Sequence, residues 1–261
     1  MNKPGYELEA KRIIDLLKKD FTLPNGTFFL EKVGKDIFPH HIFPDLGDFL
    51  PFFLYFGEED FIDKQIKIYK SVLRNGVLVS EFPSFGIKDL SKSYEYSDLL
   101  FGLYDYHIFK KDKLSLDILI DTSNTAIEIF KFDKRIMSFY YSKLGINLPI
   151  LDTRDGTFIE FYVDLYQLTK DRRYKDISYN IYENLVNSEY YKKNRLLSVF
   201  DTSFILRNLF SLIGIKKHKT VLVCKNNTNS LFGMLSLYVL TKDRKILKTI
   251  DEIIESLNSK I

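Results

Sequence analysis

The chain has 261 residues, of which 45% are hydrophobic and 28% are charged, a balance that is typical of a globular protein and excludes a disordered one. Its 38 basic and 35 acidic residues give a formal net charge of only +3, and the lysines are spread along the chain, so nucleic acid is not an expected partner. The single cysteine, Cys224, excludes an intramolecular disulfide and favours a reducing compartment. No apolar run has the length of a membrane span and the N-terminus lacks a signal-peptide pattern, so we expect a cytoplasmic protein.

The N-terminal part of the sequence predicts three helices. The first spans residues 6–20, because its leucines and isoleucines share one face and its lysines the other. A long connection, residues 21–44, leads to an apolar helix that covers residues 46–54, and Asp45 is placed to cap it. After a short corner, a more charged helix covers residues 61–73. The pattern is therefore an apolar helix, a short corner and a charged helix.

The same unit recurs toward the C-terminus, with long connections between the units. The apolar helices are expected to begin near residues 46, 94, 157, 202 and 229. Their charged partners are expected at residues 61–73, 114–130, 174–191 and 244–257. The long connections leave room for small β-hairpin pieces, and residues 77–82 are a candidate strand. The first helix has no preceding partner, so we expect it to pack against the last hairpin, residues 229–257.

A Leu-Tyr pair precedes each short corner by one to two helical turns. These pairs are Leu54-Tyr55, Leu103-Tyr104, Leu165-Tyr166 and Leu237-Tyr238. Their spacing of roughly 45 to 70 residues is too long and too variable for tetratricopeptide or ankyrin repeats. It suits helical hairpins arranged in a ring, with the apolar helices inside and the charged helices outside.

Two of these units carry a resemblance to a known group of proteins. The stretch Leu-Tyr-x-Leu-Thr-Lys-Asp-x-x-Tyr at residues 165–174 and the stretch Gly102-Leu-Tyr-Asp-Tyr106 resemble the α/α-toroid, six-hairpin glycosidase-like carbohydrate-active proteins. Within that group they are most similar to the helical domain of uronyl C5-epimerases. The resemblance implies a single all-α domain, residues 1–261, built as an α/α toroid of about five to six hairpins that need not be complete. It also implies a hydrolase, lyase or epimerase that acts on a sugar or a uronic-acid-containing oligosaccharide. No catalytic motif of the group matches this sequence, so none is carried over.

The long connections should gather at the end of the ring where the apolar helices begin. Binding groups often lie on loops held by a rigid scaffold, and helix N-termini favour anions such as carboxylates. The polar and aromatic residues around these helix starts are therefore expected to converge on one cavity. The predicted catalytic residues are Glu95, Asp98, Asp155 and Glu160. The predicted substrate-binding residues are His40, His41, Asp48, Tyr94, Tyr96, Arg154 and Asp201.

The acidic residues have the spacing of an acid–base pair. Glu95 and Asp98 are three residues apart and so share one helix face, while Glu160 lies one turn into the next apolar helix. Neighbouring helices pack about 8–10 Å apart, so carboxylates from two of them could flank one bound sugar. Glu95 or Asp98 would then work with Glu160 or Asp155 as general acid and base. Arg154 suits a carboxylate on the substrate.

Other interpretations stay open for the same residues. Asp45, Asp155 and Asp201 could cap helices, and the acids could pair with neighbouring lysines. The chain has four histidines without metal-ligand spacing, so no metal or other cofactor is expected. A second hypothesis is a non-catalytic toroid that binds a glycan or a protein partner, which the absence of tryptophan and of a family motif favours. The oligomeric state is open.

Overall fold

The structure is a computed structural model in which residues 4–22, 26, 31–33, 36–38, 42–72, 90–197, 200–202 and 224–259 are described. Helices dominate these residues and the strands are short, so the predicted all-α class with small β pieces is confirmed. The chain divides into two units, each described here by itself. Unit 1 contains Met1–Ser91 and Asp98–Thr125, and unit 2 contains Lys92–Ser97 and Ala126–Ile261. That residues 1–261 form a single domain stays a prediction.

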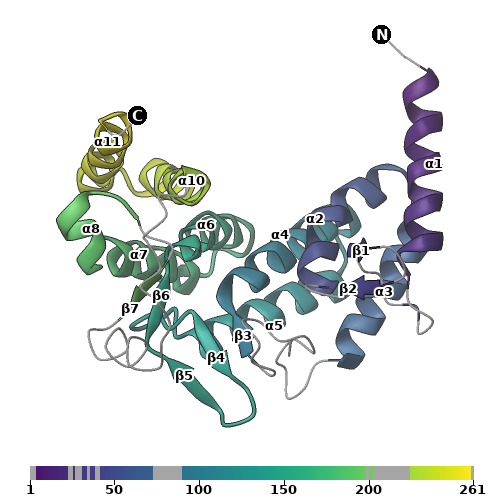
Figure 1. Cartoon of the computed structure of the whole chain (residues 1–261), viewed down its shortest axis with the longest axis horizontal. Coiled ribbons are helices and arrows are strands. Elements are labelled where there is room, and N and C mark those ends of the chain that lie inside the picture. Colours follow the sequence, from purple (N-terminus) through teal and green to yellow (C-terminus); the bar gives the residue numbers. More distant parts are fainter. Residues whose placement is uncertain are drawn as a thin grey trace. The chain divides into compact units, whose positions relative to one another are not determined.

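Unit 1 is built mainly from helices (Figure 1). Its elements are α1 (Pro4–Asp20), β1 (Glu31–Val33), β2 (Asp36–Phe38), α2 (Ile42–Tyr55), α3 (Glu59–Val72), the start of β3 (Leu90–Lys92), and most of α4 (Ser93–Lys110) and α5 (Lys113–Phe130). Strands β1 and β2 pair antiparallel, with Glu31 opposite Phe38. The apolar helices predicted to begin near residues 46 and 94 begin at Ile42 and Ser93.

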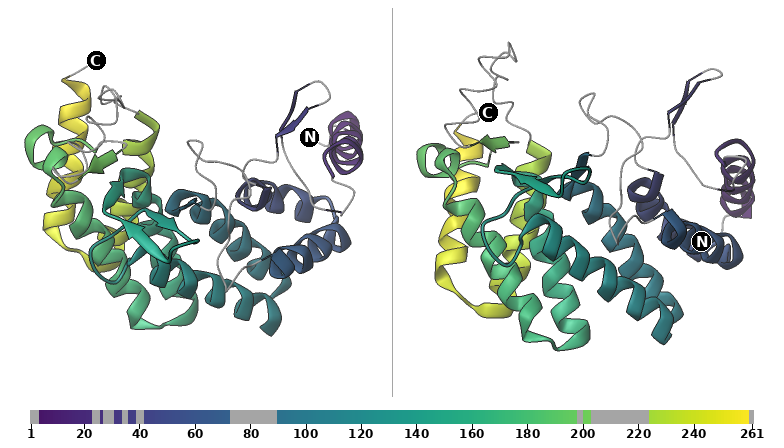
Figure 2. Two further views of the ribbon diagram at one scale, coloured as in Figure 1. Left: turned by 60° about the horizontal axis from the view of Figure 1, so that its bottom comes forward. Right: turned by 90° about the horizontal axis from the view of Figure 1, so that it is seen from below.

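The described residues of unit 2 form two helical hairpins and several short strands. Its elements are β4 (Phe139–Tyr141), β5 (Ile146–Leu148), β6 (Ile150–Asp152), the 3-10 helix η1 (Thr153–Gly156), α6 (Thr157–Thr169), α7 (Arg172–Val186), α8 (Glu189–Asn194), β7 (Phe200–Thr202), α10 (Cys224–Thr241) and α11 (Arg244–Asn258). β4 pairs antiparallel with β5 in a sheet of order β3-β4-β5, and β6 pairs antiparallel with β7. α6 packs against both α7 and α10, and α10 packs against α11 (Figure 2).

The two hairpins of unit 2 turn through the same Thr-Lys-Asp corner, residues 169–171 and 241–243. In both, the lysine adopts a left-handed backbone conformation, with φ of 61° and 59°. The aspartate then caps the next helix by accepting a 2.9 Å hydrogen bond from the backbone N–H two residues later. The threonine hydroxyl donates to the carbonyl four residues earlier, at 2.7 and 2.8 Å. The short corners predicted from the sequence therefore have a common chemical basis.

Glycines let helices approach closely in each unit. In unit 1, a Cβ atom added to Gly102 would lie 2.4 Å from the Cα atom of Gly47. In unit 2, a Cβ atom added to Gly156 would lie 2.0 Å from the Oγ atom of Ser230, and one added to Gly233 would lie 2.5 Å from the carbonyl oxygen of Gly156. The backbone of α10 therefore lies directly against the start of α6.

The core of unit 2 is aromatic. The ring of Phe132 lies 4.5 Å from that of Phe158, and the ring of Tyr162 stacks on that of Tyr174 at 6.0 Å between centroids. Burial of each such side chain contributes about 1.5–3 kcal/mol to the stability of the fold.

The leucines of the four Leu-Tyr pairs are at most 5% exposed, whereas Tyr55 is 83% exposed. The leucine is thus the shared core position of the repeated unit.

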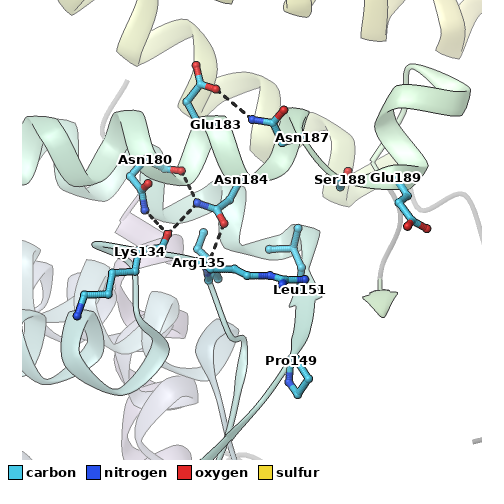
Figure 3. Close-up of a pocket in the computed structure, with 11 residues that line it drawn as sticks. Lys134, Arg135, Pro149, Leu151, Asn180, Glu183, Asn184, Asn187, Ser188 and Glu189 are labelled. Atoms are coloured by element: carbon cyan, nitrogen blue, oxygen red, sulfur yellow. Dashed lines mark hydrogen bonds between the residues drawn. The ribbon is translucent and has the colours of Figure 1, made fainter. Parts of the chain in front are cut away.

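The segment that follows α5 is held against α7 (Figure 3). The Nδ2 atom of Asn180 donates to the carbonyl oxygens of Phe132 and Lys134, both at 2.6 Å, and the Nδ2 atom of Asn184 also donates to Lys134, at 3.0 Å. The backbone N–H of Ile136 donates back to Oδ1 of Asn184 at 3.1 Å. Four hydrogen bonds to one helix face therefore fix this connection.

The packing of the first helix, the helix near residue 202 and the strand at residues 77–82 remain predictions. Within unit 1, Nζ of Lys18 in α1 lies 2.5 Å from Oε2 of Glu58 at the start of α3. The predicted packing of residues 6–20 against residues 229–257 would join unit 1 to unit 2, so it stays a prediction. The helix expected to begin near residue 202 and the strand expected at residues 77–82 fall outside the described residues, apart from the end of β7.

Candidate functional site

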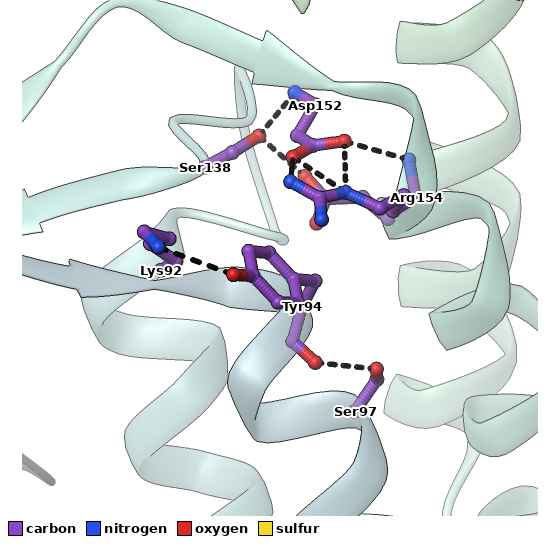
Figure 4. Close-up of polar contacts among 7 residues, drawn as sticks. Lys92, Tyr94, Ser97, Ser138, Asp152 and Arg154 are labelled. Carbon is purple, nitrogen blue, oxygen red and sulfur yellow. Dashed lines mark hydrogen bonds and ion pairs between the residues drawn. The ribbon is translucent and has the colours of Figure 1, made fainter. Parts of the chain in front are cut away.

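A cluster of polar side chains lies in unit 2, where β3 leads into α4 and β6 leads into η1 and α6 (Figure 4). We call it the Tyr94 cluster. Its members are Lys92, Ser93, Tyr94, Ser138, Asp152, Arg154 and Asp155. These residues come from three separate stretches of the unit, and they meet at the N-terminal ends of two apolar helices. This is the end of the helices at which the sequence analysis places the site.

Asp152 fixes the position of Arg154. Its carboxylate caps η1 by accepting the backbone N–H of Arg154 at 3.0 Å. The same carboxylate receives the Nε–H of Arg154, with Nε at 3.0 and 2.9 Å from its two oxygens, and it also contacts Nη2. The Asp152 side chain is 0% exposed, and a buried carboxylate is stable only when it is paired in this way.

Arg154 is also stacked on Tyr94. The Cζ atom of the guanidinium lies 3.6 Å from the centre of the Tyr94 ring, which is the geometry of a cation–π contact. On the same tyrosine, Nζ of Lys92 donates to the hydroxyl at 3.1 Å. Burial acts to lower the pKa of Arg154, but the hydrogen bond and charge of Asp152 raise it overall, so the group is cationic. Because 29% of the Arg154 side chain is exposed, the cluster presents a fixed cation to solvent.

Asp155 is a buried acid behind this cation. The Ser138 hydroxyl donates to Oδ2 of Asp155 at 2.5 Å and accepts the backbone N–H of Asp152 at 2.6 Å. Burial, and then the charge of Asp152, raise the pKa of Asp155 to about 8, against smaller opposing effects of the Ser138 and Ser93 hydroxyls. Oδ1 of Asp155 and Oγ of Ser93 are buried without a hydrogen bond in the described part of the chain. Burial therefore favours the neutral, protonated form of Asp155.

The interpretation of Asp155 as a helix cap is wrong. The N-cap of α6 is Gly156, and no side chain caps that end of the helix. The capping residue lies one short helix earlier, at Asp152. The cause is the four-residue helix η1, which separates the capping position from the start of α6.

The other predicted catalytic residues are Glu160, Asp98 and Glu95. Glu160 is half-buried in the first turn of α6, and burial raises its pKa. Asp98 belongs to unit 1, where its backbone carbonyl packs against Gly47. Glu95 lies in the first turn of α4, and its side chain is outside the described part. The structure thus brings Asp155 together with Tyr94 and Arg154, while the acid–base pairing of Glu95 or Asp98 with Glu160 or Asp155 stays a prediction.

Of the predicted substrate-binding residues, Tyr94 and Arg154 contact each other in the cluster. Tyr96 is 1% exposed and its ring packs edge-on against Phe130 at 5.2 Å, so it belongs to the core and its contact with a substrate stays a prediction. Asp201 lies on β7 opposite Leu151, and its side chain is outside the described part, as is that of Asp48 in α2. His40 and His41 lie outside the described residues.

Sequence reasoning did not select Lys92 or Ser138 as site residues, and it gave Asp152 no catalytic or substrate-binding role. For Asp152 a signal existed, because an aspartate two residues before an arginine can bind both the backbone N–H and the guanidinium. Ser138 gave no such signal. It reaches the cluster because its backbone N–H donates to the carbonyl of Ile150 at 2.8 Å, a contact that only the folded chain shows.

The described residues contain neither a metal-binding group nor a membrane-spanning helix. Among the residues whose side chains the structure describes, no group of three histidine, cysteine, aspartate or glutamate residues could hold a metal ion. Within the described ranges, no helix is both long enough and apolar enough to cross a membrane.

No protein-family model matches the sequence, and no curated protein matches it. Solved structures are nevertheless similar. The crystal structure of a D-mannose isomerase is 13% identical, with a TM-score of 0.69, and the match covers 98% of this chain and 70% of that one. The GH76 α-mannanase from Bacteroides thetaiotaomicron is 15% identical, with a TM-score of 0.61 and coverage of 99% and 73%.

A third similar structure contains a bound sugar. It is an inactive variant of the GH76A α-1,6-mannanase of Salegentibacter sp. HEL1_6 in complex with α-1,6-mannotriose, 13% identical, with a TM-score of 0.62 and coverage of 97% of this chain and 70% of that one. Identities this low show the fold alone. The expected α/α-toroid, six-hairpin glycosidase-like fold is confirmed, while the finer resemblance to uronyl C5-epimerases stays a prediction.

Proposed function

We propose that the protein is a carbohydrate-active enzyme, a hydrolase, lyase or epimerase, whose substrate binds at the Tyr94 cluster. The observation that carries this proposal is the Arg154 guanidinium, held between the buried carboxylate of Asp152 and the ring of Tyr94 and partly exposed. A preoriented cation of this kind can bind a sugar carboxylate or hydroxyl groups without first being ordered. The fold supports a sugar substrate by analogy, since similar structures are those of a mannose isomerase and of mannanases.

Within this proposal, Arg154 and Tyr94 bind and orient the sugar. Arg154 would contact the carboxylate of a uronic acid through the Nη1 side of its guanidinium, because Nε and Nη2 bind Asp152. Lys92, through its hydrogen bond to the Tyr94 hydroxyl, fixes the tyrosine. The N-terminal ends of η1 and α6 add partial positive charge to the same place. An acidic sugar is thus the favoured substrate class.

The acids near the proposed site differ in how far they are exposed to solvent. Asp155 is 0% exposed, so it acts as a positioning residue through Ser138 and does not contact the substrate. Glu160 is half-buried and its pKa is raised by burial, which is the direction that suits a general acid. Glu95 or Asp98 is the proposed second carboxylate.

A second function, the binding of a glycan or protein partner without catalysis, is supported by a separate observation. The two acids of the Tyr94 cluster, Asp152 and Asp155, are both fully buried and both engaged in structural hydrogen bonds. Such a cluster can bind a ligand without acting on it. Under either function we propose a cytoplasmic protein with a sugar ligand, in line with its single cysteine.

The experiment is an NMR time course of the purified protein with mannose, cellobiose, α-1,6-mannotriose and a uronic-acid oligosaccharide. New anomeric signals would identify hydrolysis, a vinylic proton elimination, and a changed ring coupling epimerisation. Turnover that Glu160→Gln abolishes and Arg154→Ala weakens supports the enzyme. Line broadening of a sugar without turnover supports the non-catalytic function. No binding and no turnover with any of these sugars would refute both the enzyme and the glycan-binding function.

A further inference from the structure

A cavity of about 530 Å³ lies in unit 2 against α7, away from the Tyr94 cluster (Figure 3). Its walls are one face of α7, the segment at residues 131–136, the strand β6 with the proline before it, and the start of α8. The volume falls in the range of about 300–1,000 Å³ that is common for small-molecule sites. The proposed function does not use this cavity.

Strand β6 places the cavity directly behind the candidate site. Leu151 lines the cavity, whereas the next residue, Asp152, is 0% exposed and holds Arg154 in the Tyr94 cluster. Successive side chains of a strand point to opposite faces, so β6 presents one residue to each side. A ligand in the cavity would therefore contact the strand that orients the cation of the site.

The cavity has a preformed wall. Asn180 and Asn184 of α7 make four hydrogen bonds to the backbone of Phe132, Lys134 and Ile136, which fix the backbone on both sides of Arg135. Figure 3 shows the Arg135 side chain extended along the cavity toward Leu151. A binding group on a fixed segment loses little conformational entropy when it takes up a ligand.

The charges that line the cavity are balanced. Lys134 and Arg135 lie on the segment, and Glu183 and Glu189 lie on the helices, which gives two cations and two carboxylates. Asn187 adds an amide that donates to Glu183 at 3.2 Å. A strongly anionic or cationic ligand would meet like charge on one wall. Hydroxyl groups, which both donate and accept, can bind to both walls.

The remaining wall is apolar. Pro149 and Leu151 present carbon atoms to the cavity beside the charged groups. A sugar ring combines an apolar C–H face with a rim of hydroxyl groups, so it matches a cavity with an apolar patch and polar groups of both kinds. A free amino acid or a purely ionic molecule would use only part of this lining.

We propose that this cavity is a second saccharide-binding site, for a short neutral sugar. The choice of a sugar rests on the proposed function, but the residues that form the site are different ones. Arg135 and Glu183 would bind hydroxyl groups from opposite walls, and Leu151 would contact the ring. A sugar bound in this cavity would contact β6 and would thereby affect the position of Asp152 and Arg154.

Calorimetric and NMR titrations with α-1,6-mannotriose, mannose and cellobiose test the proposal. The side-chain Nε–H signal of Arg135 should shift on addition of at least one of them. Arg135→Ala and Glu183→Gln should each weaken that binding at least tenfold. Arg172→Ala, at an exposed arginine at the start of α7 that does not line the cavity, is the matched control and should leave affinity unchanged.

The outcomes separate this site from the Tyr94 cluster. If Arg154→Ala abolishes sugar binding while both cavity variants bind as the wild type does, the proposed function stands and the second site is refuted. If the cavity variants lose binding while Arg154→Ala keeps it, the second site stands and binding of these neutral sugars at the Tyr94 cluster is refuted. Absence of any shift at Arg135 with all three sugars would also overturn the proposal.

Discussion

The guanidinium of Arg154 stacks on the ring of Tyr94 with 3.6 Å between the Cζ atom and the ring centre, and this contact joins the start of α4 to η1. Asp152 binds the same guanidinium through its carboxylate. The cation is therefore oriented by an aromatic ring and a buried acid together. The proposed function depends on this arrangement, because an arginine free to rotate would not present its donors in one direction.

Two replacements of Tyr94 should distinguish the contribution of its ring to stability from that of its hydroxyl. Tyr94→Phe keeps the stack and loses the hydrogen bond from Lys92, whereas Tyr94→Leu loses both. We expect Tyr94→Leu to lower the free energy of unfolding by about 0.5–2 kcal/mol more than Tyr94→Phe, since that is the range of cation–π contacts. Urea denaturation measures both values. Equal values for the two variants would mean that the stack contributes nothing.

The buried acid Asp155 should make stability depend on pH. Its pKa is about 8 in the folded protein, whereas an unfolded aspartate has a pKa of about 3.9. Between these values the folded state holds one more proton than the unfolded state, so the free energy of unfolding should fall as pH rises from about 4 to 8 and level off above that. Asp155→Asn removes this titration. The amide can still accept from Ser138 and gains a donor beside Ser93.

The measurement is the difference in unfolding free energy between Asp155→Asn and the wild type at pH 5, 6, 7 and 8. Other titrating groups are common to both proteins and largely cancel. The difference should grow in favour of the asparagine variant with rising pH, by up to about 1.4 kcal/mol per pH unit. A difference that does not change with pH would show that Asp155 is ionised throughout this range.

The close contact of α10 with the start of α6 predicts a steric effect. A Cβ atom at Gly156 would lie 2.0 Å from Oγ of Ser230 and 2.9 Å from its Cα atom, so Gly156→Ala must displace the backbone of α10. We expect a loss of at least about 1–3 kcal/mol, the usual cost of overpacking. Gly5→Ala is the control, because nothing lies within 4 Å of its added Cβ atom. Thermal melts of the two variants should differ clearly, and similar melting temperatures would contradict the close approach.

Much of the fold could be predicted from local sequence. The Thr-Lys-Asp corners at residues 169–171 and 241–243 contain their own turn and capping groups, and α6 begins at Thr157 as predicted. The predicted first residues of helices that lack such local turn and capping groups were less accurate. α10 was expected near residue 229 and begins at Cys224, and α2 was expected near residue 46 and begins at Ile42.

The candidate site was less predictable for a physical reason. Tyr94 and Arg154 were selected because they lie near helix starts, which is a local property. Ser138 and Lys92 join them through strand and loop packing between distant stretches, which no pattern in a single sequence encodes. Tyr96 lies two residues further along the same helix, and there the ring is buried in the core.

The corner at Asp243 should contribute to stability in two ways. Its carboxylate caps α11 through the N–H of Lys245 and accepts the hydroxyl of Tyr179 at 2.6 Å. Removal of a cap costs about 0.5–2 kcal/mol, so Asp243→Ala should lose at least this much, and Tyr179→Phe a part of it. A double-mutant cycle should give a favourable coupling between the two residues.

The same corner has a pH signature of the opposite sign to that of Asp155. The Tyr179 hydroxyl, and then the N–H of Lys245, lower the pKa of Asp243 below its ordinary value. Its contribution is therefore present above the unfolded pKa of about 3.9 and is lost as pH falls below it. The coupling between Tyr179 and Asp243 should shrink between pH 5 and pH 2. A coupling that is unchanged at low pH would mean that the carboxylate form is not required.

The central claim, that the Tyr94 cluster binds a sugar through Arg154, is tested most directly by following the Nε–H signal of Arg154 during titration with a uronic-acid oligosaccharide and with α-1,6-mannotriose. We predict that at least one of them shifts this signal. We also predict that Arg154→Ala weakens binding at least tenfold, or about 1.4 kcal/mol, while Arg172→Ala leaves it unchanged. An Arg154 signal that stays in place at saturating sugar, with equal affinity for wild type and Arg154→Ala, would contradict the claim.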